Sequence, residues 1–294
     1  MFTVRCRIFA LFAVAALLFL GLSACGSQPS SLQSSDDEPT HNPIVLVLSG
    51  WNTCWPSQET IYLSPFGMGT YDLAKGLVDR LESSFEKVPY IFTCFQFQKS
   101  WDRYKARAIT SETGKEVFLY SVEELVDSTL ELKEKYDSNE IIIIGHSQGA
   151  SLGMELVSVL PKDIKAKVLM TLDPISREHC NYWVMAGAFV TFSPSEECTQ
   201  FPSEIGSFTQ ELIRSKLDQD QGLWENWYQQ DFSFLHSGDT AYADKNVEVI
   251  HDGWDVFAHQ YVSGSDEVWE RIHDLVELQL GLQFQVSRNL YPRI

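Results

Sequence analysis

The stretch from Ile141 to Gly149 constrains the fold more than any other part of the chain. Four consecutive isoleucines run into the sequence GHSQG, and helical spacing follows. An apolar run without alternation is typical of a central parallel strand, because helices cover both of its faces. The glycines on either side of Ser147 permit a tight turn where a Cβ would clash with neighbouring elements. The stretch therefore predicts a buried strand, a sharp turn with Ser147 at its apex, and a helix.

This strand, G-x-S-x-G turn and helix resemble the nucleophile elbow of the α/β-hydrolase fold. Such a turn lifts the serine hydroxyl clear of the sheet and aims the first helix amides beside it. The resemblance extends over about 42–280 and implies a serine nucleophile at Ser147. The competing interpretation is an N-cap serine between two loop glycines.

The rest of the chain alternates between strand and helix patterns. Besides the elbow, this predicts strands at 44–48, 88–97, 167–172 and 247–250, and helices at 71–81, 122–136, 150–160 and around 268–276. Such alternation indicates a mostly parallel, doubly wound sheet with right-handed crossovers. We therefore expect an α/β-hydrolase fold in one domain, 42–294. Residues from about 175 to 242 break the rhythm and predict an insertion over the active-site edge, plus one further core element.

An activated serine needs a base within hydrogen-bond reach, and a group that orients the base. In the α/β-hydrolase family the acid follows the nucleophile and the histidine comes last, in the loop after the final strand. Here that loop is 251–265, and it offers His251 and His259. We favour His259, because it lies near the middle of the loop. Surface or packing roles are expected for the histidines of the insertion and of the exposed part of the last helix: His179, His236 and His273.

The predicted acid is Asp173, which closes the strand after the elbow helix. A carboxylate at the C-terminal edge of a parallel strand lies on the active-site side of the sheet. The placement resembles pancreatic-type lipases and related bacterial hydrolases, in which the acid follows this strand. Asp252 and Asp255, within the histidine loop, are the other candidates. A helix-capping role before Pro174 is the structural alternative for Asp173.

The oxyanion hole of this family consists of two backbone amides. The resemblance assigns one to Gln148, directly after the nucleophile, and the other to Trp51, in the loop after the first strong strand. The family often has His-Gly at the start of that loop. This chain has Ser-Gly-Trp at 49–51 instead, so Asn52 remains an alternative donor. His146 is expected to support the elbow.

The segment WENWYQ at 224–229 resembles the W-x-N-x-Y-Q segment of some bacterial lipase-like hydrolases. In those proteins a short Ser-His sequence precedes the final helix, and Ala258-His259 takes that position here. The likeness supports His259 by analogy. For the segment itself, an aromatic core patch is at least as good an interpretation as a wall of the substrate site.

The first 24 residues predict a lipoprotein signal peptide. Arg5 and Arg7 precede an apolar stretch, 8–22, that is short for a transmembrane helix. The sequence LSAC at 22–25 resembles the lipobox of bacterial lipoproteins, which implies lipidation of Cys25 and a membrane anchor. Gly26 rather than Asp follows, which by resemblance implies the outer membrane if the cell is Gram-negative. The alternative is an ordinary cleaved signal peptide.

Residues 25–41 are polar and predict a flexible tether.

Four cysteines remain beyond the anchor, an even number that suggests disulfides in an exported protein. We favour two pairs, Cys54 with Cys94 and Cys180 with Cys198. The spacing of His and Cys residues predicts no zinc site.

Without Arg5 and Arg7 the chain has 20 basic and 40 acidic residues, a net charge of −20, which disfavours nucleic acid as a partner.

Together these features predict a lipid-anchored serine hydrolase that cleaves carboxylic esters, small or lipid, without a metal or organic cofactor. Aromatic residues in the insertion favour an apolar acyl group. Acyl transfer, or cleavage of a thioester or amide, would use the same residues. A non-catalytic binding lipoprotein on the same scaffold is the interpretation from a different class.

Overall fold

The structure is a computed structural model of the chain. It describes nine stretches of the chain, all within the expected domain: residues 42–50, 70–95, 106–112, 116–119, 121–174, 210–218, 222–230, 237–250 and 258–282. Among these residues, no helix has the length and apolar character needed to cross a membrane.

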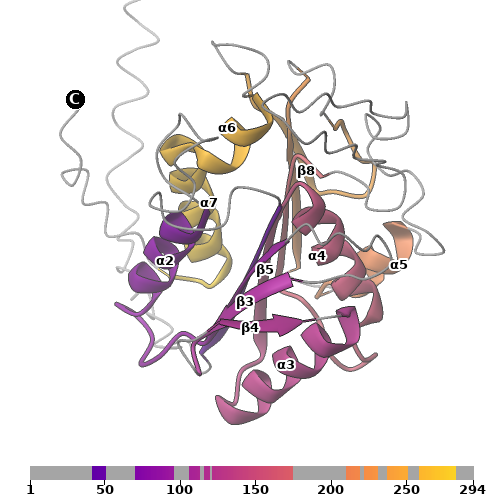
Figure 1. The fold of residues 1–294 in the computed structure, drawn as a ribbon. Coiled ribbons are helices and arrows are strands. Elements are labelled where there is room, and N and C mark those ends of the chain that lie inside the picture. Colours follow the sequence, from indigo (N-terminus) through magenta and orange to yellow (C-terminus); the bar gives the residue numbers. More distant parts are fainter. Residues whose placement is uncertain are drawn as a thin grey trace, which may run out of the picture. The chain divides into compact units, whose positions relative to one another are not determined.

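An eight-stranded sheet in the order β4-β3-β2-β1-β5-β6-β7-β8 forms the centre of the described chain (Figure 1). Six neighbouring strands are parallel to one another: β2, β1, β5, β6, β7 and β8. Beside β2, strand β3 pairs antiparallel with β2, and β4 pairs antiparallel with β3. The mostly parallel sheet confirms the predicted fold class. The strand bounds are β1 Pro43–Ser49, β2 Tyr90–Phe95, β3 Ala106–Thr110, β4 Glu116–Leu119, β5 Glu140–His146, β6 Val168–Leu172, β7 Leu223–Tyr228 and β8 Lys245–Glu248.

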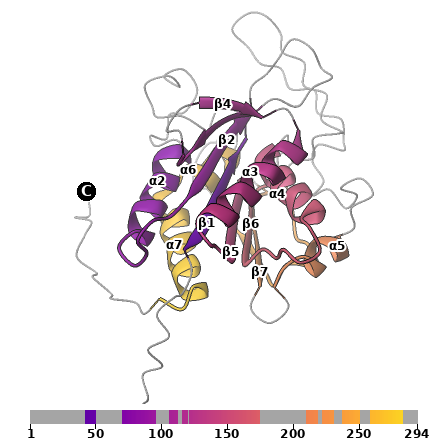
Figure 2. The same ribbon diagram turned by 90° about the horizontal axis from the view of Figure 1, so that it is seen from below.

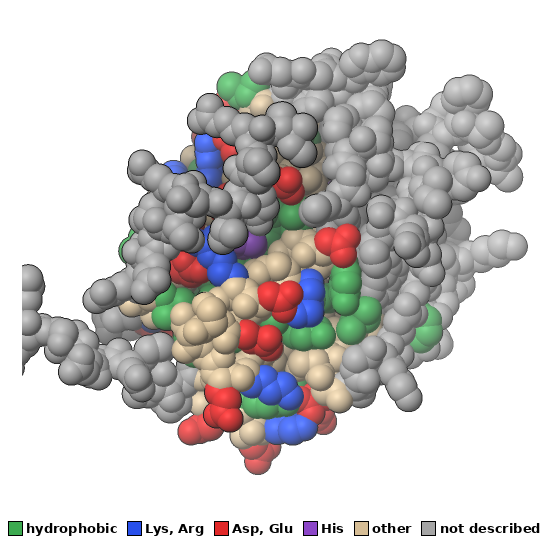
Figure 3. Space-filling model, turned by 90° about the vertical axis from the view of Figure 1, so that its left-hand side faces the viewer, with side chains coloured by type: hydrophobic (Ala, Val, Ile, Leu, Met, Phe, Trp, Pro, Cys, Tyr) green, Lys and Arg blue, Asp and Glu red, His purple; other side chains and the backbone are tan. Residues whose placement is uncertain are grey.

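Helices cover both faces of the sheet, as a doubly wound fold requires (Figures 1 and 2). One face carries α2 (Thr70–Leu81), α6 (Ala258–Gly264) and α7 (Asp266–Gln279). The other carries α3 (Val122–Lys135), α4 (Gln148–Val159) and α5 (Gln210–Ser215). Figure 3 shows the side of the molecule on which α2 and α7 lie, where acidic and basic side chains are interspersed.

The unbroken apolar runs of β1 and β5 follow from this two-sided burial. In β5, Ile141 and Ile143 pack on the α3–α4 side, whereas Ile142 and Ile144 pack on the α2–α7 side. All four are at most 1% exposed. Successive strand side chains point to opposite faces, so a strand with two covered faces needs apolar residues at every position.

Two parts of the sheet differ from the prediction. The antiparallel strands β3 and β4 were not predicted, because each has only four or five residues and pairs at the edge of the sheet. Strand β7 lies inside the range 175–242, where an insertion was predicted, and pairs with both β6 and β8. It is the further core element expected there, and α5 precedes it. No pattern in WENWYQ distinguishes a strand from a loop, because polar and aromatic residues are mixed.

Candidate active site

Ser147 occupies the turn between β5 and α4, as predicted. Its backbone has φ 57° and ψ −127°, a conformation that is unfavourable for a residue with a side chain. The Ser147 N–H donates to the carbonyl of Leu172, at 2.9 Å, and thereby ties the turn to the end of β6. The residue is 6% exposed. Backbone strain of this kind is maintained only where the surroundings fix it, which marks the turn as a functional candidate.

The glycines of the turn are required by close packing, as predicted. A Cβ on Gly149 would lie 1.8 Å from the carbonyl oxygen of Leu48, so the first turn of α4 presses directly on the backbone of β1. A Cβ on Gly145 would lie 2.5 Å from the Cα of Ala150. These contacts lie far inside the separation of real carbon atoms, so a side chain at either position would displace the helix from the sheet.

The end of β1 lies against the candidate nucleophile. A Cβ on Gly50 would be 2.5 Å from Ser147 Cβ and 3.0 Å from Ser147 Oγ. Gln148 is the first residue of α4, where backbone N–H groups have no acceptor within the helix. The two places from which the oxyanion amides were predicted, the start of α4 and the end of β1, therefore meet at Ser147. Trp51 and Asn52 lie outside the described residues.

Asp173 and His259 form a direct pair. His259 Nδ1 lies 2.6 Å from Asp173 Oδ2, and the two residues are 5% and 0% exposed. Asp173 follows β6 with φ 45°, and its N–H donates to the carbonyl of Trp227 on β7. Aspartate adopts this left-handed conformation more readily than most residues. The turn places the carboxylate at the same sheet edge as Ser147.

The Asp173 carboxylate accepts four hydrogen bonds from residues that the structure describes. Oδ2 accepts from Gln229 Nε2 at 2.7 Å, in addition to His259. Oδ1 accepts from the backbone N–H and the hydroxyl of Ser237, at 2.9 and 2.6 Å. An ionised carboxylate can only accept hydrogen bonds, and donors such as these offset the cost of burying its charge. The helix-capping interpretation of Asp173 does not describe this environment, because the carboxylate bonds to side chains and backbone from three other segments.

His259 lies on a helix, whereas the sequence predicted a loop over 251–265. It is the second residue of α6, a seven-residue helix. The segment AHQYVSG has little apolar periodicity, so its helical character was not visible in the sequence. The competing candidates, His251, Asp252 and Asp255, lie outside the described residues, as do His179 and His236.

His146 also contacts the candidate base, His259. Its Nε2 donates to the backbone carbonyl of His259 at 2.9 Å, and the two ring centroids are 4.6 Å apart at an interplanar angle of 35°. Burial, and to a lesser degree the neighbouring His259, hold the pKa of His146 well below its ordinary value. The ring is therefore neutral at physiological pH.

Two residues of the site were not assigned their roles from the sequence. Gln229 ends the WENWYQ segment, and the signal was the likeness to W-x-N-x-Y-Q. Ser237 had no signal, because a single serine in a polar stretch is indistinguishable from a loop residue. The two tryptophans of the segment, Trp224 and Trp227, are at most 1% exposed, which confirms the core-patch interpretation.

His273 has a packing role, one of the two roles predicted for it, but its predicted exposed position was wrong. It was expected on the exposed part of the last helix, but it is 7% exposed and packs against Trp269, with ring centroids 5.9 Å apart. It is one of the five buried residues of α7, whereas Leu275, which the pattern placed on the apolar face, is only partly buried.

The cysteine predictions fall largely on residues that the structure does not describe. Cys25, Cys54, Cys180 and Cys198 lie outside the described residues, and only the backbone of Cys94 is described. Within the described part of the chain, no group of three or more His, Cys, Asp or Glu side chains is arranged to hold a metal ion.

Comparison with known proteins gives structural likenesses only. No protein-family model matches the chain, and no curated protein sequence matches it. Among solved structures, an uncharacterized protein from Bacillus cereus is 12% identical, with a TM-score of 0.44 over 92% of this chain and 67% of that chain. Est1E from Butyrivibrio proteoclasticus, with ferulic acid bound, is 11% identical, with a TM-score of 0.42 over 83% of this chain and 94% of that chain. Naproxen esterase (carboxylesterase NP) from Bacillus subtilis is 11% identical, with a TM-score of 0.38 over 81% and 85%.

Proposed function

We propose that the protein is a serine hydrolase that cleaves carboxylic esters with Ser147 as nucleophile, His259 as base and Asp173 as the residue that orients the base. The observation that carries the proposal is the buried 2.6 Å contact between His259 and Asp173 at the sheet edge where Ser147 occupies a strained turn. A nucleophile, a base and a third orienting group in one place are the requirements of acyl transfer.

The orientation of the imidazole supports these roles. Nδ1 donates to a carboxylate, so the neutral ring carries its proton there and Nε2 has a free lone pair. An imidazole in this tautomer can accept the hydroxyl proton of serine. Asp173 then stabilises the imidazolium that forms, without itself taking a proton.

The proposed reaction has two halves, acylation of Ser147 and hydrolysis of the acyl-enzyme. Ser147 Oγ forms a bond to the acyl carbon while its proton moves to His259 Nε2. The resulting oxyanion accepts hydrogen bonds from the amides of Gln148 and Trp51. His259 then returns the proton to the leaving alcohol oxygen as the bond from carbon to that oxygen breaks. In the second half, water attacks the acyl carbon and gives a proton to His259. His259 then returns that proton to Ser147 Oγ as the bond from carbon to Oγ breaks, which releases the carboxylic acid and restores Ser147.

A fluorophosphonate probe tests the proposal directly, because it phosphonylates only an activated serine. The purified domain, 42–294, is incubated with the probe, and the labelled peptide is identified by mass spectrometry. We expect labelling at Ser147, and hydrolysis of p-nitrophenyl butyrate that the Ser147→Ala variant lacks. An unlabelled Ser147 in a protein that circular dichroism shows to be folded would overturn the proposal.

We also propose that Cys25 is lipidated and anchors the domain to the bacterial cell envelope. The support is the sequence LSAC after a charged and apolar leader. Membranes of expressing cells are separated by centrifugation, and the Cys25→Ser variant should move the protein out of the membrane fraction. Equal retention of the variant and the native protein would contradict lipidation at this residue.

A further inference from the structure

A second buried histidine, His146, lies at the site and has no part in the proposed chemistry. It is the last residue of β5 and directly precedes Ser147 in the chain. Its side chain is engaged twice with the same neighbour: Nε2 bonds the backbone carbonyl of His259, and the ring lies against the ring of His259. The residue is 1% exposed.

The hydrogen bond fixes the direction of the interaction. A backbone carbonyl can only accept, so Nε2 of His146 carries the proton. Because the ring is neutral, as its lowered pKa requires, it donates without adding a charge beside the base. His146 thus holds the backbone of His259 and leaves the proton transfer to the other ring.

The contact with Asp173 does not by itself fix the orientation of the His259 ring. It holds the imidazole at one atom, Nδ1, about which the ring can still pivot. The distance between Nε2 and a substrate-bound serine depends on that pivot, and a displacement of about 1 Å can cost 100-fold in rate. A tie to the backbone of His259 and a surface against its ring remove that freedom.

We propose that His146 is a positioning residue, which fastens the first turn of α6 to the end of β5 and so sets the His259 imidazole relative to the Ser147 hydroxyl. The inference rests on the proposed function. Its structural basis is that His146 and Ser147 are consecutive. The segment that carries the nucleophile is therefore the same segment that holds the backbone of the base.

Two substitutions separate positioning from packing. His146→Phe keeps a ring of similar size and removes the donor. His146→Gln removes the ring but carries an amide N–H at about the reach of Nε2. On p-nitrophenyl butyrate, we expect the Phe variant to lose about 10- to 100-fold in kcat with KM changed less than about twofold, because the loss falls on alignment in the transition state. The Gln variant should recover kcat to within about fivefold of the native protein.

His146→Asn extends the test to the case in which the Phe variant does not fold. The shorter side chain places its amide near the position of Nδ1, where it cannot reach the carbonyl of His259. The Asn variant should therefore lose activity as the Phe variant does, while Gln retains it. The rate of fluorophosphonate labelling at Ser147 should follow the same order.

His273→Phe is the matched control, since it replaces another buried histidine on the same face of the sheet. Its kcat and KM should stay within about twofold of the native values. Equal activity of the native, Phe and Gln proteins would overturn the inference while leaving the proposed function intact. Equal loss in Gln and Phe would also overturn it, because the donor would then not matter. A native protein that is not labelled at Ser147 would overturn the proposed function, and this inference with it.

Discussion

His259 Nδ1 lies 2.6 Å from Asp173 Oδ2, in a place where both residues are almost fully buried. The carboxylate cannot rotate without breaking bonds to three residues at once, since Gln229 and Ser237 hold its two oxygens. The ends of β6 and β7, the stretch around Ser237 and α6 together fix this one pair. The position of the Asp173 carboxylate is thus determined by several segments at the sheet edge and not by the histidine alone.

Asp173→Asn should lower kcat/KM on p-nitrophenyl butyrate by about 10³- to 10⁴-fold. The amide can donate to His259 Nδ1 and so favours the tautomer in which Nε2 carries the proton and cannot act as a base. Steady-state kinetics measure the loss. Asp127→Asn, on the exposed side of α3, is the control and should leave kcat/KM unchanged. Activity near the native level in the Asp173 variant would place the acid elsewhere.

Gln229→Glu should impair the site more than Gln229→Leu does. The leucine removes one donor from Asp173 Oδ2, and a hydrogen bond to a charged group contributes about 1.5–3 kcal/mol, so we expect a loss of about 10- to 100-fold in kcat/KM. The glutamate removes the same donor and adds a second carboxylate beside Asp173, where like charges disfavour joint ionisation. Kinetics of both variants on one ester decide the order, and a Glu variant as active as the Leu variant would contradict this account.

The parts of the site that could be predicted were those with a strong local pattern. The unbroken isoleucines of β5 and the glycines beside Ser147 predict an element and a turn, because burial on both faces and close backbone packing leave few other residue choices. Asp173 was predictable once a strand was placed before it, since strand ends share one edge of a parallel sheet.

The residues that surround Asp173 could not be predicted, because their roles depend on contacts between distant segments. Ser237 reaches the carboxylate from 64 residues away in the chain, and His259 from 86. His259 was chosen from the order of residues in a known family, and the helix on which it lies was not predicted. The burial of α6 depends on its packing against α2 and α7, and the sequence AHQYVSG alone does not reveal that packing.

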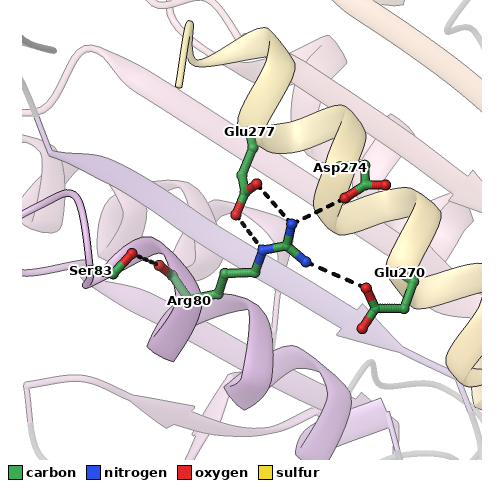
Figure 4. A network of polar contacts seen from close by, with 5 residues as sticks. All are labelled: Arg80, Ser83, Glu270, Asp274 and Glu277. Carbon is green, nitrogen blue, oxygen red and sulfur yellow. Dashed lines mark hydrogen bonds and ion pairs between the residues drawn. The ribbon is translucent and has the colours of Figure 1, made fainter. Parts of the chain in front are cut away.

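Arg80→Met should destabilise the fold by about 1–2 kcal/mol. Arg80 on α2 binds Glu277 of α7 through two guanidinium nitrogens, and also contacts Asp274 at 3.1 Å and Glu270 at 3.4 Å (Figure 4). The Arg80 side chain is 33% exposed and that of Glu277 is 13% exposed, so the pair is only partly screened by solvent. Because Arg80 binds Glu277 through two nitrogens and contacts two further carboxylates, we expect it to stabilise the fold more than an ordinary surface ion pair does.

Urea unfolding measures this loss. Arg271→Ala is the control. Arg271 lies on α7 and forms an exposed pair with Glu267, which should contribute less than about 0.5 kcal/mol. Arg80→Lys should not restore stability fully, since an ammonium cannot bind a carboxylate through two fixed nitrogens. Equal effects of the Arg80→Met and Arg271→Ala substitutions would show that the network is no more than a surface contact.

His273 should make the fold less stable as the pH falls from about 6.5 to about 4. Burial, with a smaller effect of the Arg80 charge, lowers the pKa of His273 to about 4, and Asp274 opposes that shift. The unfolded chain binds a proton at its ordinary pKa of about 6.5, so between these values it binds more protons than the folded state. The stability associated with the neutral ring is therefore fully present above about pH 6.5 and is lost as the pH falls, by up to about 3 kcal/mol.

His273→Leu removes this proton linkage, because leucine does not titrate. The native protein and the variant share every other titrating group, so the difference between their unfolding free energies isolates His273. Between pH 7.5 and pH 5, urea unfolding should show that difference moving by about 2 kcal/mol in favour of the leucine variant. Any constant offset at pH 7.5 reports packing against Trp269 and not titration. Parallel stability curves over this range would mean that the ring of His273 reaches solvent and titrates as it does in the unfolded chain.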